Sequence, residues 1–285
     1  MAFVFVAGST NGLVNRYDAA IGASIGSGAF IHPGAAGLRT PTGLTVGPDG
    51  HLYVADFIGN SVLRFDTGTG APVGNGSFVP SNDAGLTKPA GLAFGPDGHL
   101  YVTSSDTAEV LRFDGKTGAP VGTGGFVEAG SAGLFRPFGV AFAGDGSLYV
   151  CDTSSVIYRF DGTTGKPVGT GVVVPSGPFG VAFTGLAFGP DGFLYVAASF
   201  PAAVIRYDVP TGTPIGSDGV FVPASRGLDH PNSLAFAPGG DLVVADATKG
   251  VLRFKANVGS AVGTGPFVPV GLGGVNGPTA VAFSR

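Results

Sequence analysis

Several residue types are scarce or missing in this chain of 285 residues, and each shortage excludes something. There is no tryptophan, and Cys151 is the only cysteine, so an internal disulfide bond is impossible. No run of about 18 apolar residues occurs, so we expect no membrane span. No basic leader or cleavage site precedes the first apolar segment, Ala2–Val6, so we expect no signal peptide in this chain.

Basic residues are also few, and this shortage bears on the partners. Charged residues make up only 12% of the chain, and the net charge is −4. A protein that binds nucleic acid needs a basic stripe facing the phosphates. Only five lysines are present, and six of the ten arginines fall at equivalent positions of a repeat. We therefore predict that nucleic acid is not a partner.

Glycine and proline are abundant instead, with 52 and 22 residues, and they recur at fixed offsets. They accompany a motif of arginine, an aromatic residue and usually aspartate. Successive motif arginines are 48, 48, 47, 47 and 47 residues apart: Arg16, Arg64, Arg112, Arg159, Arg206 and Arg253. A fixed period of this size indicates a propeller or a solenoid. Because every unit carries the motif, we expect its arginines to serve packing by bonding neighbouring carbonyl or carboxylate groups.

One unit, Pro89–Val127, contains four short segments rich in strand-forming residues. They are Gly91–Phe94, Leu100–Thr103, Val110–Phe113 and the outer segment Pro120–Val127. Glycine-rich turns separate them, and we expect the aspartate of each Gly-Pro-Asp-Gly-type turn to cap its own backbone. Four antiparallel strands of this kind form one blade of a β-propeller.

Six such units account for the whole chain, so we predict a single all-β domain, residues 1–285, folded as a six-bladed β-propeller. Each blade would have four antiparallel strands. One blade would be shared between the two termini, with residues 278–285 supplying its first strand and residues 1–30 the others. Closing the ring in this way removes the free sheet edge that an open array would expose.

Two further features call for a structural interpretation. The segment Phe179–Phe183 repeats the motif of Thr184–Phe188. We interpret the second copy as the strand and place the first in the connecting loop, either as a tolerated duplication or as an apolar lip over the channel. Cys151 stands where most other units have alanine, which favours a small buried thiol over a reactive one.

The segment Pro89–Val102, followed by Val110–Phe113, resembles the NHL repeat, and Gly59–Phe65 matches that repeat's Asn-x-x-x-Arg spacing. The resemblance covers nearly the whole chain and is greatest to exported bacterial NHL arrays, which implies an exported or extracellular protein. The wider group of six-bladed propellers includes gluconolactonase-like hydrolases, paraoxonase-like lactonases, streptogramin lyases and RNA-binding NHL domains. The fold is shared by proteins with all of these functions, so only the residues of the site can distinguish among them.

The enzymes of this group provide the alternative function, a metal-dependent lactonase-like hydrolase or a streptogramin-lyase-like enzyme. The resemblance implies a divalent metal held by glutamate, asparagine and aspartate oxygens in the first, and a histidine base near magnesium in the second. The only glutamates here, Glu109 and Glu128, fall in loops. Asn232 alone resembles a ligand of the gluconolactonases, and His230 is the only histidine expected at the channel mouth.

Aspartate ends the second strand of alternate units, at Asp56, Asp152 and Asp246. One interpretation is that each carboxylate caps the backbone of the loop that follows. The other is a set of three carboxylates around the channel mouth, which would hold Ca²⁺ or Mg²⁺ if their oxygens converged. We predict no cofactor, with such a divalent cation in the central channel as the alternative.

The loops that enter the first strands and those between second and third strands are expected to share one face, and loops on a rigid scaffold concentrate binding residues. The units differ most at these places. The candidate ligand-binding residues stand at or shortly before the start of a first strand: Arg39, Lys88, Arg136, Phe138, His230 and Asn232. We predict a monomeric, non-catalytic binding or scaffold protein whose ligand is a small molecule, a glycan or another protein.

Overall fold

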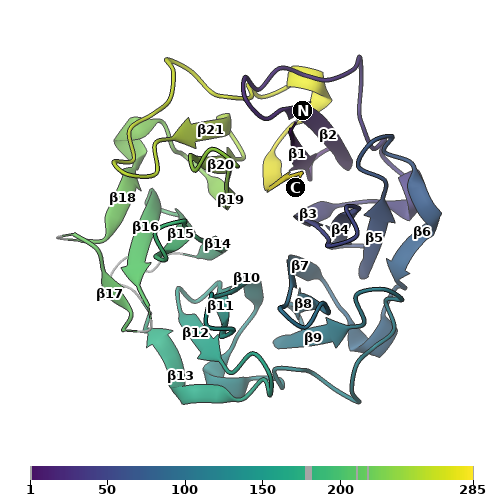
Figure 1. Ribbon diagram of the computed structural model, residues 1–285, viewed down its shortest axis with the longest axis vertical. Coiled ribbons are helices and arrows are strands. Elements are labelled where there is room, and N and C mark those ends of the chain that lie inside the picture. The colour runs from purple at the N-terminus through teal and green to yellow at the C-terminus, as the bar shows by residue number, and fades with distance from the viewer. Residues whose placement is uncertain (1, 177–181, 210, 217, 285) are drawn as a thin grey trace.

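The computed structural model describes residues 2–176, 182–209, 211–216 and 218–284. The described residues form 22 β-strands and five short 3₁₀-helices, and the strands assemble into six antiparallel sheets. The sheets are arranged around a central axis, and the chain passes from one to the next in sequence order (Figure 1). The all-β prediction is therefore confirmed. Within these ranges, no helix has the length and apolar character needed to cross a lipid bilayer.

Each sheet places one strand beside the central channel, and these six inner strands have closely similar sequences. They are β3 (Pro41–Val46), β7 (Pro89–Phe94), β10 (Pro137–Phe142), β14 (Phe183–Phe188), β19 (Pro231–Phe236) and β22 (Pro278–Phe283). The second strands pair with them: β1 (Phe3–Gly8), β4 (Leu52–Asp56), β8 (Leu100–Ser104), β11 (Leu148–Asp152), β15 (Leu194–Ser199) and β20 (Leu242–Asp246).

The third strands carry the repeat arginines and lie farther from the axis. They are β2 (Leu13–Asp18), β5 (Ser61–Phe65), β9 (Glu109–Phe113), β12 (Ile157–Phe160), β16 (Ala202–Asp208) and β21 (Gly250–Phe254). Five 3₁₀-helices lie in the connections that lead to the next inner strand: η1 (Ala35–Gly37), η2 (Asp83–Gly85), η3 (Ser131–Gly133), η4 (Ala224–Arg226) and η5 (Leu272–Gly274).

The outer strand is less regular than the sequence predicts. It is formed by β6 (Pro72–Val79), β13 (Pro167–Val174) and the pair β17 (Thr213–Pro214) and β18 (Val220–Pro223) in three sheets. In the other three, the described outer segment makes only isolated bridges to the third strand, such as Val110 with Val127 and Phe113 with Pro120. The residues between these bridges include three glycines, which have low strand propensity. The prediction of an outer fourth strand is thus correct for three of the six sheets.

The hydrophobic core lies between neighbouring sheets. Tyr53 packs edge-on against Phe78 of its own sheet and against Phe94 of the next, with ring centroids 4.8 and 5.0 Å apart. Tyr101 and Tyr195 repeat the arrangement in their sheets. Edge-to-face aromatic pairs add to the free energy gained by burying the rings. Each sheet therefore completes its core only with its neighbour.

The two ends of the chain meet in one sheet, of order β2-β1-β22. Strands β1 and β22 pair antiparallel, with Val4 opposite Phe283, and the two termini lie close together in Figure 1. The backbone N–H of Ser284 donates to the carbonyl of Phe3 at 2.9 Å, which extends the pairing. Strand β22 also contacts β3 on one side and β19 on the other.

The structure confirms the local roles that the repeat predicts. Arg16 donates through one guanidinium nitrogen to the carbonyls of Thr67 and Gly68 in the next sheet, at 3.0 and 2.7 Å. Arg159 instead bonds the Asp145 carboxylate at 2.9 Å. The Asp145 carboxylate also accepts from the Ser147 N–H, the self-capping expected of turn aspartates. These contacts tie turns to one another.

Two smaller predictions also concern these strands. Cys151 is fully buried, and burial raises the pKa of its thiol to about 12, so it is a packing residue rather than a nucleophile. Of the doubled motif, the second copy is the inner strand β14, as predicted. Most of the first copy, residues 179–181, lies outside the described residues.

We predict that deleting Pro278–Arg285 removes the inner strand of the sheet that joins the termini and lowers Tm by more than about 10 °C, or abolishes cooperative unfolding. Ala280, Val281 and Ala282 are all buried and would be lost from the core. Thermal unfolding followed by circular dichroism measures the effect, with deletion of Arg285 alone as the control. A deletion variant that melts like the full chain would contradict the pairing of β22 with β1.

Candidate functional site

One face of the molecule gathers the loops that enter the inner strands and the loops between second and third strands. The same backbone hydrogen bond holds them together in every sheet, and it spans 2.9 to 3.4 Å. The last residue of the second strand, or the one directly after it, donates its N–H to the carbonyl of the residue that precedes the inner strand. The pairs are Phe57–Thr40, Ser105–Lys88, Thr153–Arg136, Ser199–Ala182, Ala247–His230 and Ser9–Gly277. We call this surface the loop face. The shared hydrogen bond confirms the prediction that the two sets of loops lie on the same face.

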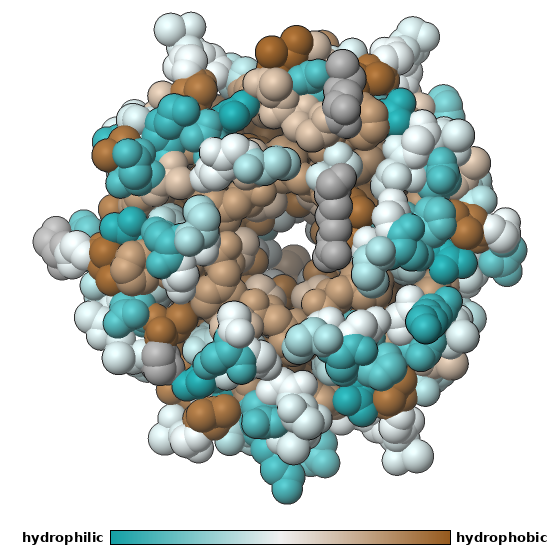
Figure 2. Space-filling model, in the orientation of Figure 1, coloured by the Kyte–Doolittle hydropathy of each residue, from teal (hydrophilic) through white to brown (hydrophobic). Residues whose placement is uncertain are grey.

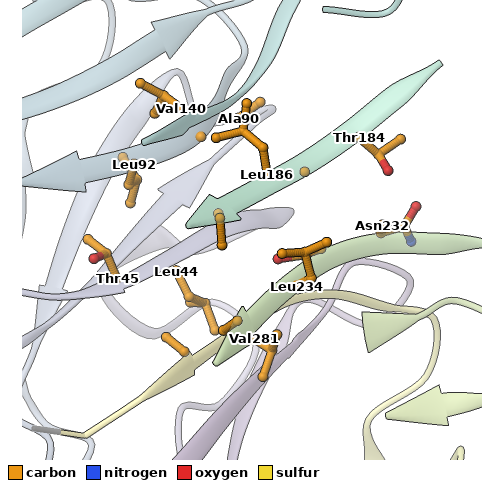
Figure 3. A pocket seen from close by; sticks show the side chains of 18 of the residues that line it. Leu44, Thr45, Ala90, Leu92, Val140, Thr184, Leu186, Asn232, Leu234 and Val281 are labelled. Carbon is orange, nitrogen blue, oxygen red and sulfur yellow. The ribbon is translucent and has the colours of Figure 1, made fainter. Parts of the chain in front are cut away.

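The six inner strands enclose a channel of about 620 Å³. Its wall carries one aliphatic side chain from each strand at the same level: Leu44, Leu92, Val140, Leu186, Leu234 and Val281. Figure 2 shows the hollow at the centre of the molecule, with apolar residues around it and hydrophilic residues toward the periphery. The close view in Figure 3 shows these side chains converging from separate strands.

The channel wall contains no titratable side chain among the residues that the structure describes. Its polar groups are threonine and serine hydroxyls and the amide of Asn232. A general base needs a titratable group within hydrogen-bond reach of the substrate, and a hard divalent cation needs several carboxylate or carbonyl oxygens. The described wall supplies neither a base nor a carboxylate.

The polar groups at the channel entrance bond neighbouring strands to each other. The hydroxyls of Thr42, Thr184 and Thr279 each donate to a carbonyl at the start of the next inner strand, at 2.8 to 2.9 Å. The Asn232 amide makes the equivalent bond to the carbonyl of Pro278 at 3.0 Å. Thr184 and Asn232 lie at the same end of the channel on adjacent strands (Figure 3). The Asn232 amide therefore makes the hydrogen bond between inner strands that a threonine hydroxyl makes at the equivalent positions.

Phe138 occupies the same entrance position in its own strand. It lines the channel and is partly exposed, and its carbonyl accepts a hydrogen bond from the Thr103 hydroxyl at 2.9 Å. The ring is thus the largest side chain at the channel entrance. Of the six candidate ligand-binding residues, only Phe138 and Asn232 line the channel itself.

The three alternate aspartates all cap loop backbone. Asp56 accepts from the N–H groups of Arg39 and Thr40, at 3.0 and 2.8 Å. Asp246 accepts in the same way from Asp229 and His230, at 2.7 and 2.9 Å. All three carboxylates are buried, and those of Asp152 and Asp246 also accept from the N–H groups of Ser154 and Thr248 in the loop that follows.

Asp56, Asp152 and Asp246 are also the predicted candidates for metal ligands. In the parts of the chain that are described, no group of three or more His, Cys, Asp or Glu side chains could hold a metal ion. Asp152 receives hydrogen bonds from the Phe135 N–H at 3.2 Å and from the Tyr158 hydroxyl at 2.9 Å. Burial raises the pKa of Asp152, and burial likewise raises the pKa of Tyr158. The geometry fits the capping interpretation of these aspartates.

The basic candidates lie around the loop face, outside the channel. Lys88 pairs with Asp106 at 2.8 Å, and His230 lies 3.5 Å from Asp229. Arg39 and Arg136 are both exposed, and no carboxylate of the described residues lies within salt-bridge distance of either guanidinium. Two positive charges of the loop face are thus open to a ligand.

Large apolar side chains are exposed beside these charges. On the loop face, Ile58 is 59% exposed, Phe135 is 56% exposed and Phe200 is 79% exposed. Neither Ile58 nor Phe135 is among the residues that the sequence predicts for this face. Both are large apolar residues in loops where most other units carry small or polar ones, and this contrast between units is the signal that would have found them.

We predict that Asn232→Thr leaves the free energy of unfolding within about 0.5 kcal/mol of the parent value, because threonine makes the same bond at three equivalent positions. Asn232→Val removes the donor and is expected to destabilise the fold by about 1 kcal/mol. Urea denaturation of both variants provides the comparison. Equal losses in the two variants would refute a structural role for the Asn232 amide.

Comparisons with known proteins agree with this architecture. Residues 38–65 match the family model of the NHL repeat. A chain of the nidogen/laminin complex superposes with a TM-score of 0.74 over 100% of this chain and 99% of that one, at 17% identity. No curated protein sequence matches the chain.

Two lactonase structures are similar as well. The gluconolactonase XC5397 from Xanthomonas campestris has a TM-score of 0.62 and 17% identity over 79% of this chain and 75% of its own. A putative 6-phosphogluconolactonase from Bacteroides uniformis has a TM-score of 0.61 and 18% identity over 99% of both chains. At such identities the likeness concerns the fold alone. Together these structures show that the chain has a β-propeller fold, in which residues 38–65 match the NHL repeat.

Proposed function

We propose that this protein is a closed, six-bladed β-propeller that acts as a monomeric, non-catalytic binding module through its loop face. The observation that carries the proposal is the contrast between its two candidate surfaces. The described channel wall has no titratable group, whereas the loop face carries two arginines without carboxylate partners and several exposed apolar side chains. A ligand that is bound without being transformed fits this distribution.

Closure of the ring supports the binding role because it makes the loop face rigid. Inner strands contact one another in an unbroken order, β3, β7, β10, β14, β19, β22 and back to β3. Buried aspartates and serine hydroxyls then fix the loops onto the strand ends. Binding residues on loops that a scaffold holds in place lose little freedom on binding, which favours affinity.

The lactonase-like alternative rests on the likeness of the fold to two lactonases. The residues of this chain do not complete such a site, because Asn232 is bonded to the next strand and Asp56, Asp152 and Asp246 are bonded to loop backbone. An enzyme of this kind would need a divalent metal in the channel, where no described carboxylate reaches it.

We predict that Ca²⁺, Mg²⁺ or Mn²⁺ at millimolar concentration leaves Tm unchanged, because a ligand stabilises the native state only where it binds. We further expect no hydrolysis of glucono-1,5-lactone above the uncatalysed rate in the presence of these metals. Differential scanning fluorimetry and a pH-stat assay measure the two quantities. A metal-dependent rise in Tm together with lactone hydrolysis would establish the enzyme in place of the binding module.

We also predict that an array of peptides and glycans yields ligands whose binding is lost in Arg136→Ala or Phe138→Ala. Both side chains belong to the loop face or its channel entrance, and truncating a central contact at an interface commonly weakens binding about tenfold or more. The control is Lys116→Ala, which removes an exposed charge from the turn after β9. Hits that both variants retain would place the binding surface elsewhere, and an array without hits would count against the binding role.

A further inference from the structure

Lys88 and Arg136 share an unusual backbone conformation at equivalent positions of neighbouring sheets. Both have a left-handed backbone, with φ of 46° and 47°. Both precede a proline, which normally restricts the preceding residue to extended conformations. Left-handed geometry is uncommon for residues other than glycine and asparagine, and strain of this kind clusters at functional sites.

The fold does not require a long side chain at this position. In the sheet that joins the termini, the equivalent residue is Gly277, which has φ of 57° without strain. Glycine would therefore satisfy the backbone at Lys88 and Arg136 as well. The chain instead carries two basic residues there, and this points to a role for their side chains outside the fold.

A short series of contacts joins the two residues into one patch. Lys88 Nζ lies 2.8 Å from the Asp106 carboxylate. Ser105, the residue before Asp106, donates its buried hydroxyl to the carbonyl of Pro137 at 2.7 Å, directly after Arg136. The loop between β8 and β9 thus holds Lys88 on one side and the Arg136 segment on the other.

Aromatic rings flank both cations. Lys88 Nζ is 5.9 Å from the centroid of the Phe57 ring, and the Arg136 guanidinium is 5.9 Å from that of Phe135. Phe135 is 56% exposed, and Ile58, next to Phe57, is 59% exposed. Exposed aromatic residues beside arginine are the composition that protein interfaces favour at their centres. We call these residues the Lys88–Arg136 patch: Phe57, Ile58, Lys88, Asp106, Phe135 and Arg136.

The charges of the patch are unequal. Asp106 neutralises Lys88, but no carboxylate among the described residues pairs with Arg136. The buried carboxylate of Asp152 already accepts from the Phe135 N–H, the Tyr158 hydroxyl and the N–H of Ser154 in its own loop. A guanidinium presents a planar fork of donors that matches a carboxylate in a bidentate pair.

We infer that the Lys88–Arg136 patch binds an acidic segment of a partner protein, which pairs a carboxylate with Arg136 and packs an apolar side chain against Phe135. This inference rests on the proposed binding role of the loop face and names the chemistry of its partner. One open arginine between apolar side chains fits a mixed acidic and apolar peptide, whereas a polyanion would need a continuous row of cations.

The test uses fluorescein-labelled 12-residue peptides of mixed Asp, Glu, Phe and Leu, with charge-reversed and uncharged peptides of the same apolar content. Fluorescence anisotropy with the full chain is expected to show that the acidic peptides bind and that the others do not. Raising the salt concentration should weaken this binding, because partly exposed charges are screened.

Glycine variants separate binding from folding. Arg136→Gly and Lys88→Gly are expected to leave Tm unchanged or to raise it by up to about 3 °C, since they relieve the left-handed strain. Arg136→Gly should weaken acidic-peptide binding at least tenfold, and Arg136→Lys should weaken it less because it keeps the charge but loses the fork. The control Lys116→Ala also removes one exposed positive charge and should bind as the parent does.

Several results would overturn the inference. They are equal binding of charge-reversed peptides, undiminished binding by Arg136→Gly, or a preference for heparin or oligo-dT over the acidic peptides. If the peptide and glycan array yields uncharged ligands that need Phe138 and not Arg136, the acidic partner is wrong while the loop-face binding role stands. If no ligand of any class binds, both proposals are wrong.

Discussion

Packing between neighbouring sheets is the interaction on which this structure depends. A tyrosine from the second strand of one sheet, such as Tyr101, fills the space between that sheet's outer segment and the inner strand of the next. A sheet by itself would leave these rings exposed, so each repeat is stable only between two others. The last sheet must therefore meet the first, and the pairing of β1 with β22 places both ends of the chain in one sheet.

The close approach of the inner strands determines the chemistry of the channel. A Cβ atom on Gly43 or Gly91 would clash with a carbonyl oxygen of the neighbouring strand, so glycine is required at these positions. The hydroxyls of Thr42, Thr184 and Thr279 then bond the strands to one another. Side chains that hold the ring together are not free for catalysis. The rest of the described wall is mostly aliphatic and aromatic, with no titratable side chain, so a ligand of the channel would meet no charge there.

The loop face follows a different rule, because its backbone is fixed while its exposed side chains vary. Buried carboxylates at Asp56, Asp152 and Asp246 hold the backbone, and a serine hydroxyl at Ser104 does the same for the Thr87 N–H in another sheet. Residues that point outward from such loops can change without loss of the fold. Lys88 and Arg136 combine a left-handed backbone with a long basic side chain on this face.

The sequence by itself determined the all-β class, the period, the positions of the inner strands and the roles of the repeat arginines and turn aspartates, because these are local patterns that recur in each unit. Candidate residues such as Asn232 and His230 could be placed near the channel mouth from their position in the repeat. Their hydrogen-bond partners could not be predicted in the same way, since Asn232 donates to Pro278 in another sheet. The exposure of Phe135 could not be predicted either, because it depends on how a loop packs. Only the tertiary structure decided that the alternate aspartates turn inward to loop backbone, that half of the outer segments do not form strands, and that Arg136 has no described carboxylate beside it. The physical reason is that spacing along the chain fixes which side of a strand a residue occupies, whereas the contacts between sheets decide whether its polar group is already bonded.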